Sequence, residues 1–292
     1  MDILNISHVS KSFGSNQVID DLSFSVPEHS VFGFIGKNGA GKTTTMKMAL
    51  GLLKADGGEI FVNGEKVRFG QNTTNRYIGY LPDVPEFYGF LTPGEYLKMC
   101  GEITGMEKAQ IQERAKELLA LVGLESVNKR IRGFSRGMKQ RLGIAQALLN
   151  QPRLLICDEP TSALDPVGRK EILDILHAVK EHTTVLFSTH ILSDVERICD
   201  RIAFLHEGKI ALKGTIDEIK NIRKGDSIEI EFFRPEDAKR FLQIQETAVQ
   251  TERTKVLRSG NRQTDMLAVM KLLAEQHIFI QRLEQLEPTL ED

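Results

Sequence analysis

One glycine-rich stretch has the residue types that surround the phosphates of a nucleotide. Residues 36–43 read GKNGAGKT and match the pattern G-x-x-x-x-G-K-[ST]. Glycines allow a tight loop whose backbone N–H groups converge on one anion. Lys42 is expected to reach the β- and γ-phosphates, and the Thr43 hydroxyl to ligate Mg²⁺. The residues predicted to contact the nucleotide here are Gly36, Lys37, Asn38, Gly39, Ala40, Gly41, Lys42, Thr43 and Thr44.

Two adjacent carboxylates follow a second apolar stretch. Residues 154–160 read LLICDEP, so Asp158 and Glu159 stand at the end of a predicted strand. Asp158 is suited to hold Mg²⁺ beside the phosphates. Glu159 is suited to polarise the attacking water as a general base. An Asp-Glu pair after an apolar strand is a weak signal alone, so this prediction depends on the glycine-rich loop.

Two further stretches leave alternatives open. STH at 188–190 ends another predicted strand, where His190 is a candidate to hydrogen-bond a γ-phosphate; the alternative is a structural histidine. In FSRGMKQ at 134–140, Ser135 is predicted to cap a helix that begins near Gly137. The free N–H groups of that helix would form a second anion site. The alternative there is an ordinary N-cap between two helices.

The elements that must position these residues alternate along the chain. Residues 1–35 are predicted to form strands, and 43–53 a helix that directly follows the loop. A mostly helical segment covers about 88–150. Strands and helices then alternate up to residue 220, which predicts a largely parallel sheet flanked by helices. The helical segment therefore interrupts an α/β core.

The helical segment has recognisable start and stop signals. Thr92, Pro93 and Glu95 can occupy the N-cap, N1 and N3 positions of a capping box. A second helix is expected to end at Gly123, and a third before Pro152.

The composition changes after about residue 220. DSIEIEFF alternates as a strand, 235–244 is helical, and DMLAVMKLLAEQ is an amphipathic helix. Residues 1–220 are therefore expected to form one domain and 221–292 a small accessory α/β domain.

The amino-acid composition argues against several classes of protein. The chain has 292 residues, 41% of them hydrophobic and 27% charged, as in globular proteins. Its net charge of −2 argues against a dedicated nucleic-acid binder, so no nucleic-acid partner is expected. Three widely spaced cysteines predict neither a disulfide framework nor a zinc site, and favour a reduced, cytoplasmic compartment. The sequence lacks a signal-peptide pattern and a run of about 18 apolar residues, so no membrane span is expected.

Taken together, GKNGAGKTT, FSRGMKQR, LLICDEPTSALD and STH resemble, in this order, the nucleotide-binding domain of ABC transporters. The resemblance covers residues 1 to about 220. It implies an α/β fold with a P-loop NTPase (RecA-like) core, an ABC β-subdomain and a helical subdomain, followed by a small C-terminal α/β extension. It also implies hydrolysis of ATP with Mg²⁺. Phe13 matches the aromatic residue that stacks on adenine, and Asp165 ends the SALD segment that crosses to a second cassette.

By the same resemblance, Ser135 and Gly137 meet the γ-phosphate bound on a second cassette. The implied partners are that second cassette, in a homodimer or a heterodimer, and a separate transmembrane permease. This chain is then expected to be cytoplasmic and peripheral on the cytoplasmic face of the cell membrane. Two positions depart from the family pattern. Arg136 and Met138 stand where the usual LSGGQ has Gly and Gln, and Asp83 replaces the usual Gln that contacts Mg²⁺. A carboxylate can ligate Mg²⁺ but cannot donate a hydrogen bond.

The segment after Asp83 lies where the family docks its membrane partner. Its aromatic residues Phe87, Tyr88 and Phe90 are candidates for interface anchors or for local core. The sequence of this segment resembles that of single-cassette subunits that power export of drugs, antibiotics or antimicrobial peptides. LEPTLED resembles the tail of that branch, which usually continues into a final helix, so truncation of the chain stays open.

Three rival classes are weaker. DNA-repair ATPases that share this type of nucleotide-binding domain carry long coiled-coil insertions between the phosphate loop and the signature motif. Only short helices are predicted in that interval here. ABC ATPases that act in translation have two cassettes, whereas this chain has one. A GTPase would carry an N-K-x-D motif that recognises guanine, and this sequence has none. A soluble ABC ATPase that serves cofactor assembly stays open as the alternative.

Overall fold

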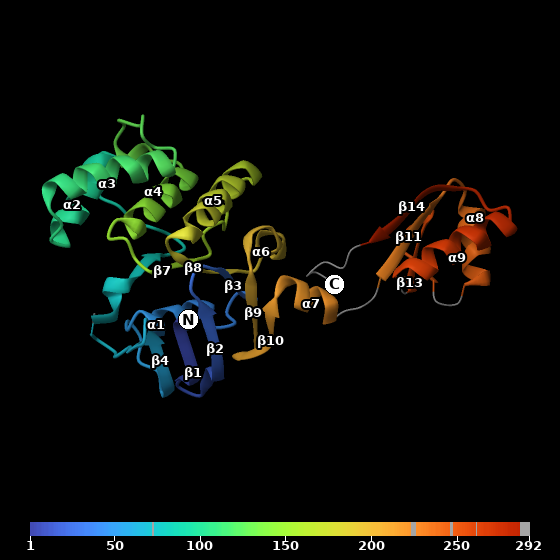
Figure 1. Ribbon diagram of the computed structural model, residues 1–292, viewed down its shortest axis with the longest axis horizontal. Coiled ribbons are helices and arrows are strands. Elements are labelled where there is room, and N and C mark those ends of the chain that lie inside the picture. Colours follow the sequence, from blue (N-terminus) through green and yellow to red (C-terminus); the bar gives the residue numbers. More distant parts are fainter. Residues whose placement is uncertain (72, 223–225, 246–247, 261, 287–292) are drawn as a thin grey trace. The chain divides into compact units, whose positions relative to one another are not determined.

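The chain divides into two units, which are described separately: unit 1, Met1–Ile216, and unit 2, Asp217–Asp292. The computed structural model describes residues 1–71, 73–222, 226–245, 248–260 and 262–286 (Figure 1). The boundary lies four residues before the one expected from the change in composition.

Short apolar strands build the central sheet of unit 1. Its order is β10-β9-β3-β8-β7-β6, with β10 antiparallel to β9 and the other strands parallel. Three of them are buried along their whole length, as expected where both faces of a parallel sheet are covered. The strands are β3 (Val31–Ile35), β6 (Ile78–Leu81), β7 (Leu154–Asp158), β8 (Thr184–Thr189), β9 (Arg201–His206) and β10 (Lys209–Thr215).

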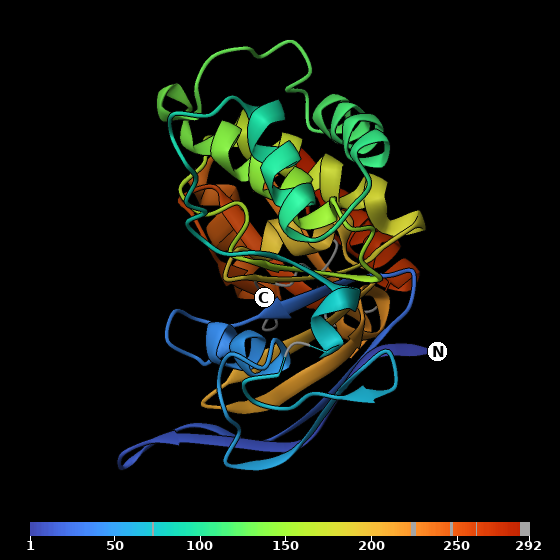
Figure 2. The same ribbon diagram turned by 90° about the vertical axis from the view of Figure 1, so that its left-hand side faces the viewer.

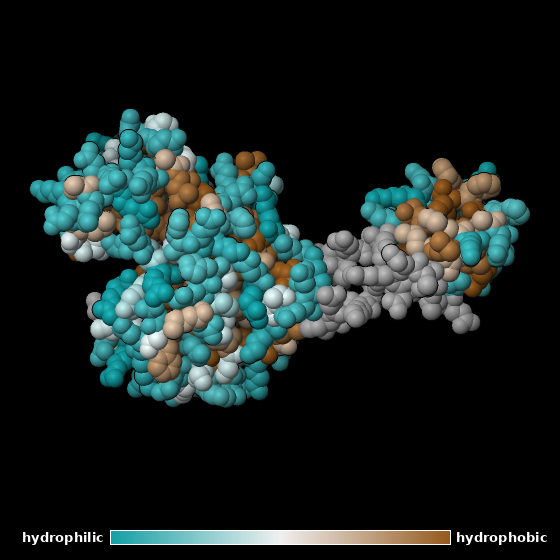
Figure 3. Space-filling view, viewed as in Figure 1, coloured by the Kyte–Doolittle hydropathy of each residue, from teal (hydrophilic) through white to brown (hydrophobic). Residues whose placement is uncertain are grey.

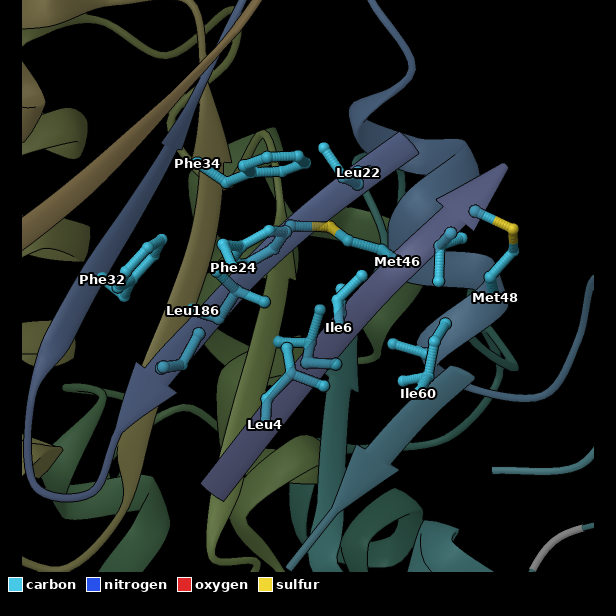
Figure 4. Close-up of a cluster of buried hydrophobic side chains, with 14 of the residues drawn as sticks. Leu4, Ile6, Leu22, Phe24, Phe32, Phe34, Met46, Met48, Ile60 and Leu186 are labelled. Carbon is cyan, nitrogen blue, oxygen red and sulfur yellow. The ribbon is translucent and has the colours of Figure 1, made fainter. Parts of the chain in front are cut away.

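A second, antiparallel sheet covers one side of this core. Its order is β2-β1-β4-β5, and its strands are β1 (Asp2–Phe13), β2 (Asn16–Pro27), β4 (Gly57–Val62) and β5 (Glu65–Lys66). Helix α1 (Lys42–Ala49) contributes Met46 and Met48 to the same hydrophobic cluster as the strands (Figure 4). Phe24 stacks on Phe32 and Phe34 at centroid distances of 5.6 and 5.1 Å. The packed cluster holds α1, and therefore the glycine-rich loop, in a fixed place.

Helices gather at the other end of unit 1, away from the antiparallel sheet (Figures 1 and 2). Thr92 and Glu95 form the predicted capping box at the start of α2. The helices are α2 (Pro93–Ile103), α3 (Lys108–Leu121), α4 (Arg136–Leu148), α5 (Pro166–Ala178) and α6 (Leu192–Ile198), with 3₁₀ turns η2 (Ile131–Gly133) and η3 (Val179–Glu181). The 3₁₀ turn η1 (Thr73–Tyr77) lies instead beside β5, where Arg76 and Tyr77 donate to Glu65.

Unit 2 has the chain order β-α-β-β-α-β, the split-βαβ arrangement of ferredoxin-like folds. Its sheet has the order β12-β13-β11-β14 and all its described pairings are antiparallel. Phe232 and Phe241 meet in its core, which is separate from that of unit 1. The elements are β11 (Asp226–Phe232), α8 (Pro235–Ile244), β12 (Ala248–Gln250), β13 (Lys255–Gly260), α9 (Arg262–Glu275) and β14 (Ile280–Leu286), preceded by α7 (Ile216–Ile222).

The predicted α/β class is confirmed, whereas the end of the first helix was predicted wrongly. The helix expected at 43–53 ends at Ala49, because Gly51 takes a left-handed φ of 68°. Helix α5 begins at Pro166, since Asp165 caps it and proline is favourable at its first position. The helix of FSRGMKQ, by contrast, begins at Arg136 with Ser135 as its N-cap, which agrees with the predicted start near Gly137.

The aromatic residues after Asp83 divide between core and surface. The ring of Phe87 packs edge-on against Tyr96 of α2 at 5.0 Å. Tyr88 and Phe90 pack against each other at 5.9 Å, and both side chains are more than half exposed. On the face of unit 1 that Figure 3 shows, hydrophilic residues predominate and apolar residues lie among them. Phe87 is therefore local core, while Tyr88 and Phe90 are available to a partner.

Candidate nucleotide site

The glycine-rich loop connects the buried strand β3 to α1. Gly41 has a φ of 108°, and a Cβ atom there would lie 2.5 Å from Cδ1 of Ile19. Both facts require glycine at this position. The buried Lys42 donates from Nζ to the carbonyl oxygens of Gly36 (2.5 Å) and Lys37 (3.2 Å). Backbone carbonyl oxygens of the loop therefore fix the position of the Lys42 ammonium group.

Asp158 is a buried carboxylate with two hydroxyl partners. The Thr43 Oγ1 hydroxyl donates to its Oδ2 at 2.7 Å, and the Ser188 Oγ hydroxyl donates to its Oδ1 at 2.7 Å. Ser188 Oγ also accepts from the backbone N–H of Glu159 at 3.0 Å. These bonds join the loop, β7 and β8 at one point. Burial and the charge of Asp158 also raise the pKa of the half-buried Tyr80 to about 12.

Glu159 follows directly and turns back towards the loop. Its backbone has a φ of 47°, an uncommon left-handed conformation for a residue other than glycine. Its Oε1 lies 3.0 Å from Lys42 Nζ, in an ion pair without hydrogen-bond geometry, and its Oε2 lies 3.0 Å from His190 Nδ1. The carboxylate is 12% exposed and is held between an ammonium group and an imidazole.

The two departures from the family pattern contact each other. Arg136 Nη2 lies 3.1 Å from Asp83 Oδ1. Gln140, one turn further along α4, is fully buried and donates from Nε2 to the Asp83 carbonyl oxygen at 2.6 Å. The start of α4 therefore binds both the side chain and the backbone of the Asp83 loop. The Arg136 guanidinium, which replaces a glycine of the family pattern, is therefore paired with the Asp83 carboxylate, which replaces a glutamine.

Most of the predicted site residues meet at one cavity of about 310 Å³. A volume of this size is within the range of small-ligand sites. The residues that line it are Asn38, Gly39, Gly41, Lys42, Thr43, Thr44, Asp83, Asp158, Glu159, Ser162 and His190. Carboxylates, hydroxyls, a histidine and an ammonium group thus converge from four separate segments of the chain.

Seven predicted residues do not line this cavity: Gly36, Lys37 and Ala40 belong to the glycine-rich loop, and the other four lie elsewhere. Phe13 is half exposed at the end of β1, with Lys11 Nζ 5.3 Å from its ring centroid. Ser135 caps α4 by accepting from the Met138 N–H at 3.3 Å. Gly137 lies in the first turn of that helix, and Asp165 caps α5 by accepting from the Gly168 N–H at 3.1 Å. Each of these four is explained locally as a cap or a strand end, and none is placed to complete its own chain's site.

Sequence reasoning missed three contributors. Ser188 was part of the STH motif, but no role was assigned to it, although a hydroxyl beside a predicted Mg²⁺ carboxylate was a usable signal. Ser162 lines the cavity, and Gln140 reaches the Asp83 loop through tertiary packing. Periodicity places Gln140 on a helix face without saying what that face contacts.

The residues present fit a nucleoside triphosphate with Mg²⁺. The loop supplies convergent N–H groups, Lys42 opposes phosphate charge, and Thr43 with Asp158 offers the oxygen ligands that Mg²⁺ prefers. Among the described residues, no group of three or more His, Cys, Asp and Glu is arranged to hold a metal alone.

No helix in the described part of the chain is both long and apolar enough to cross a membrane.

Comparison with known proteins agrees with this geometry. The profile described as ABC transporter matches residues 19–162, and that of the C-terminal domain of DrrA1-3-like ATP-binding proteins matches residues 214–292. The chain is similar to the bacitracin transport ATP-binding protein BcrA of Bacillus licheniformis, with 41% identity over 75% of this chain and 71% of BcrA. It is also similar to the uncharacterized ABC transporter ATP-binding protein YhcH of Bacillus subtilis (strain 168), with 36% identity over 99% of this chain and 94% of YhcH.

Among solved structures, an ATP-binding subunit of an ABC transporter is 35% identical, with a TM-score of 0.68 over 75% of this chain and 92% of that one. The fold and the site therefore define an ATP-binding cassette. The chain belongs to the ABC transporter family of ATP-binding proteins and carries a DrrA-like C-terminal domain.

We predict that Ser188→Ala weakens binding of Mg·ATP and slows its hydrolysis by at least tenfold. The change removes one donor to Asp158 and one acceptor for the Glu159 N–H, so two buried groups lose a partner. Titration with a fluorescent ATP analogue and a phosphate-release assay measure both effects. Ser15→Ala, in an exposed turn, is the matched control. Unchanged affinity and turnover in Ser188→Ala would show that the Asp158 carboxylate needs no support from β8.

Proposed function

We propose that this chain is the ATP-hydrolysing subunit of a membrane exporter and drives transport through a separate transmembrane permease. The observation that carries the proposal is the convergence of Lys42, Thr43, Asp158, Glu159 and His190 on one cavity. Similarity to BcrA, a bacitracin transport protein by name, supports export of an antibiotic or antimicrobial peptide. The reaction is transfer of the γ-phosphoryl group of ATP to water.

Lys42, Thr43 and Asp158 hold Mg·ATP, with Asp83 as a further carboxylate on the same cavity. When bound, Mg²⁺ neutralises phosphate charge and orients the γ-phosphate for displacement. Lys42 has two competing anions, because its Nζ already lies beside Glu159. Phosphate binding draws Lys42 away from that carboxylate. Glu159 is then free to accept a proton from the attacking water.

His190 keeps Glu159 in place during this exchange. Its Nδ1 lies 3.0 Å from Glu159 Oε2, so it orients the carboxylate when Lys42 has left. The same imidazole lines the cavity and is positioned to sense the γ-phosphate. The left-handed backbone of Glu159 aims its side chain back into the site, and such strain commonly accompanies function.

Glu159→Gln is expected to bind ATP and to lose at least 99% of hydrolysis. The amide keeps the size of the side chain but cannot accept a proton at neutral pH. A nucleotide-binding assay and a phosphate-release assay separate the two effects. Glu207→Gln, in an exposed turn, is the matched control. Turnover within about twofold of wild type in Glu159→Gln would remove Glu159 from the role of base.

The site is completed by a second cassette. Ser135 and Asp165 are exposed and lie outside their own chain's cavity, which supports a role towards a partner. Ser135 and the start of α4 present hydroxyl and N–H donors that suit a γ-phosphate. The working state is therefore a dimer of cassettes, either two copies of this chain or this chain with a relative.

Ser135→Arg is expected to abolish turnover while the isolated monomer still binds ATP. The larger side chain blocks the composite site and leaves the glycine-rich loop of the same chain unchanged. Ser135→Ala, which removes the N-cap without adding a large side chain, controls for the loss of about 1 kcal/mol that removal of a helix cap causes. ATP binding by the mutant monomer is measured by equilibrium titration and folding by thermal unfolding. Loss of ATP binding by a folded Ser135→Arg monomer would contradict a role in trans.

The permease is proposed to dock beside the Asp83 loop, which places the subunit at the cytoplasmic face of the membrane. The exposed pair Tyr88 and Phe90 lies on that segment. Exposed aromatic residues are frequent interface anchors. Asp83 connects this surface to the cavity, and Arg136 connects it to α4. A change of state at the phosphates is thereby transmitted to the permease.

The double variant Tyr88→Ser/Phe90→Ser is expected to lose the permease while ATP binding persists. The tagged chain is purified from detergent-solubilised membranes, and a co-purifying multi-span protein is identified by mass spectrometry. Phe69→Ser, another exposed phenylalanine, is the control. Equal recovery with the double variant would move the interface elsewhere. Recovery of soluble partners alone with the wild type would favour cofactor assembly over export.

A further inference from the structure

Strand β14 forms an edge of the sheet in unit 2. In the sheet order β12-β13-β11-β14, β11 is its one neighbour among the residues that the structure describes. An edge strand presents a row of backbone N–H and C=O groups that can pair with another strand. With residues Ile280–Leu286, β14 is long enough for such pairing, whereas the opposite edge strand β12 has three residues.

The charges on β14 are arranged symmetrically about its centre. Arg282 and Glu284 flank Leu283, and their side chains are 58% and 43% exposed. The two form an ion pair along the strand. In the pairing with β11, Glu284 lies opposite Glu229, and like charges at directly opposed positions are destabilising. Glu284 therefore has an unfavourable neighbour on one side and an open edge on the other.

We propose that β14 is a homodimer interface, at which two copies of this chain pair antiparallel about a twofold axis through Leu283. Arg282 then lies opposite Glu284 of the partner subunit, and Glu284 opposite the partner's Arg282. Each Glu284 gains a cation directly across the strand, which offsets the repulsion from Glu229. Because the axis is perpendicular to the sheet, the two sheets join into one continuous sheet with equivalent faces aligned.

The charges select this register over its neighbours. A shift of the antiparallel pairing by two residues places Arg282 opposite Arg282, or Glu284 opposite Glu284. A shift by one residue puts the charges on the wrong face of the sheet. Parallel pairing in register also opposes like charges. Only the register centred on Leu283 matches both charges at once.

The same features limit the assembly to a dimer. A twofold contact uses the same surface on both copies and is closed. The irregular register between Glu231 and Phe232 leaves Gln281 as an extra residue in β14, and such bulges end regular pairing. The short β12 edge offers little to a third chain. This contact needs no nucleotide, so it goes beyond the ATP-dependent contact between cassettes.

The experiment uses the full chain without nucleotide and measures association by sedimentation velocity at about 0.15 M salt. Arg282→Glu and Glu284→Arg each place like charges at both pairs, so each variant alone is expected to dimerise at least tenfold more weakly than wild type. An equimolar mixture of the two variants restores opposite charges at both pairs. It is expected to form a heterodimer with affinity close to that of wild type.

The mixture distinguishes the interface from an effect within one chain, because neither chain changes on mixing. Lys239→Glu, an exposed charge reversal on α8, is the control and keeps wild-type association. If a charge reversal unfolds unit 2, as judged by circular dichroism, Arg282→Gln and Glu284→Gln replace the pair and are each expected to weaken dimerisation. A wild-type chain that stays monomeric at about 100 µM, neutral variants that dimerise like wild type, or a mixture that associates no better than its components would overturn the proposal.

Discussion

The site depends on one buried carboxylate, Asp158, that is shared between two hydroxyl groups. Thr43 belongs to the glycine-rich loop and Ser188 to β8, while Asp158 itself ends β7. A buried carboxylate without partners is strongly unfavourable, so these two hydrogen bonds fix the relative positions of three segments. The short buried strands that carry these groups can tolerate little displacement at this point. The packing of the core and the geometry of the site therefore constrain each other.

The side chains around Glu159 are what the proposed mechanism uses to respond to phosphate. Lys42 Nζ lies 3.0 Å from Glu159 Oε1, and His190 Nδ1 lies 3.0 Å from Glu159 Oε2. In the proposed mechanism, the phosphates compete for Lys42, whereas His190 stays beside the carboxylate. The arrangement of these groups would then depend on whether phosphate is present. The Asp83–Arg136 contact would extend this dependence to the start of α4 and to the loop that carries Tyr88 and Phe90.

Much of the cassette was predictable because its signals are local. The loop at 36–43, the capping box at Thr92 and the alternation of buried strands are all encoded within a few residues. Helix ends were less accurate, since a single left-handed residue such as Gly51 can end a helix before the apolar pattern does. Phe87 could not be told from Tyr88 because their difference lies in a contact with α2.

Long-range pairing was the larger omission. The Arg136 and Asp83 departures were each interpreted separately, although they contact each other across 53 positions of sequence. A basic residue in one motif and an acidic residue in another is a signal, but it needs the fold to say that the two segments meet. The ferredoxin-like order of unit 2 was hidden for the same reason, because strand order depends on pairings between distant segments.

A composite site makes its rate depend on how often two cassettes meet. If two chains associate only through ATP, each cycle begins with a bimolecular encounter. A contact through β14 that persists without nucleotide makes the second encounter intramolecular, at an effective concentration that reaches millimolar for short connections. Dimerisation in unit 2 would thus raise the rate of cassette closure without adding any group to the site.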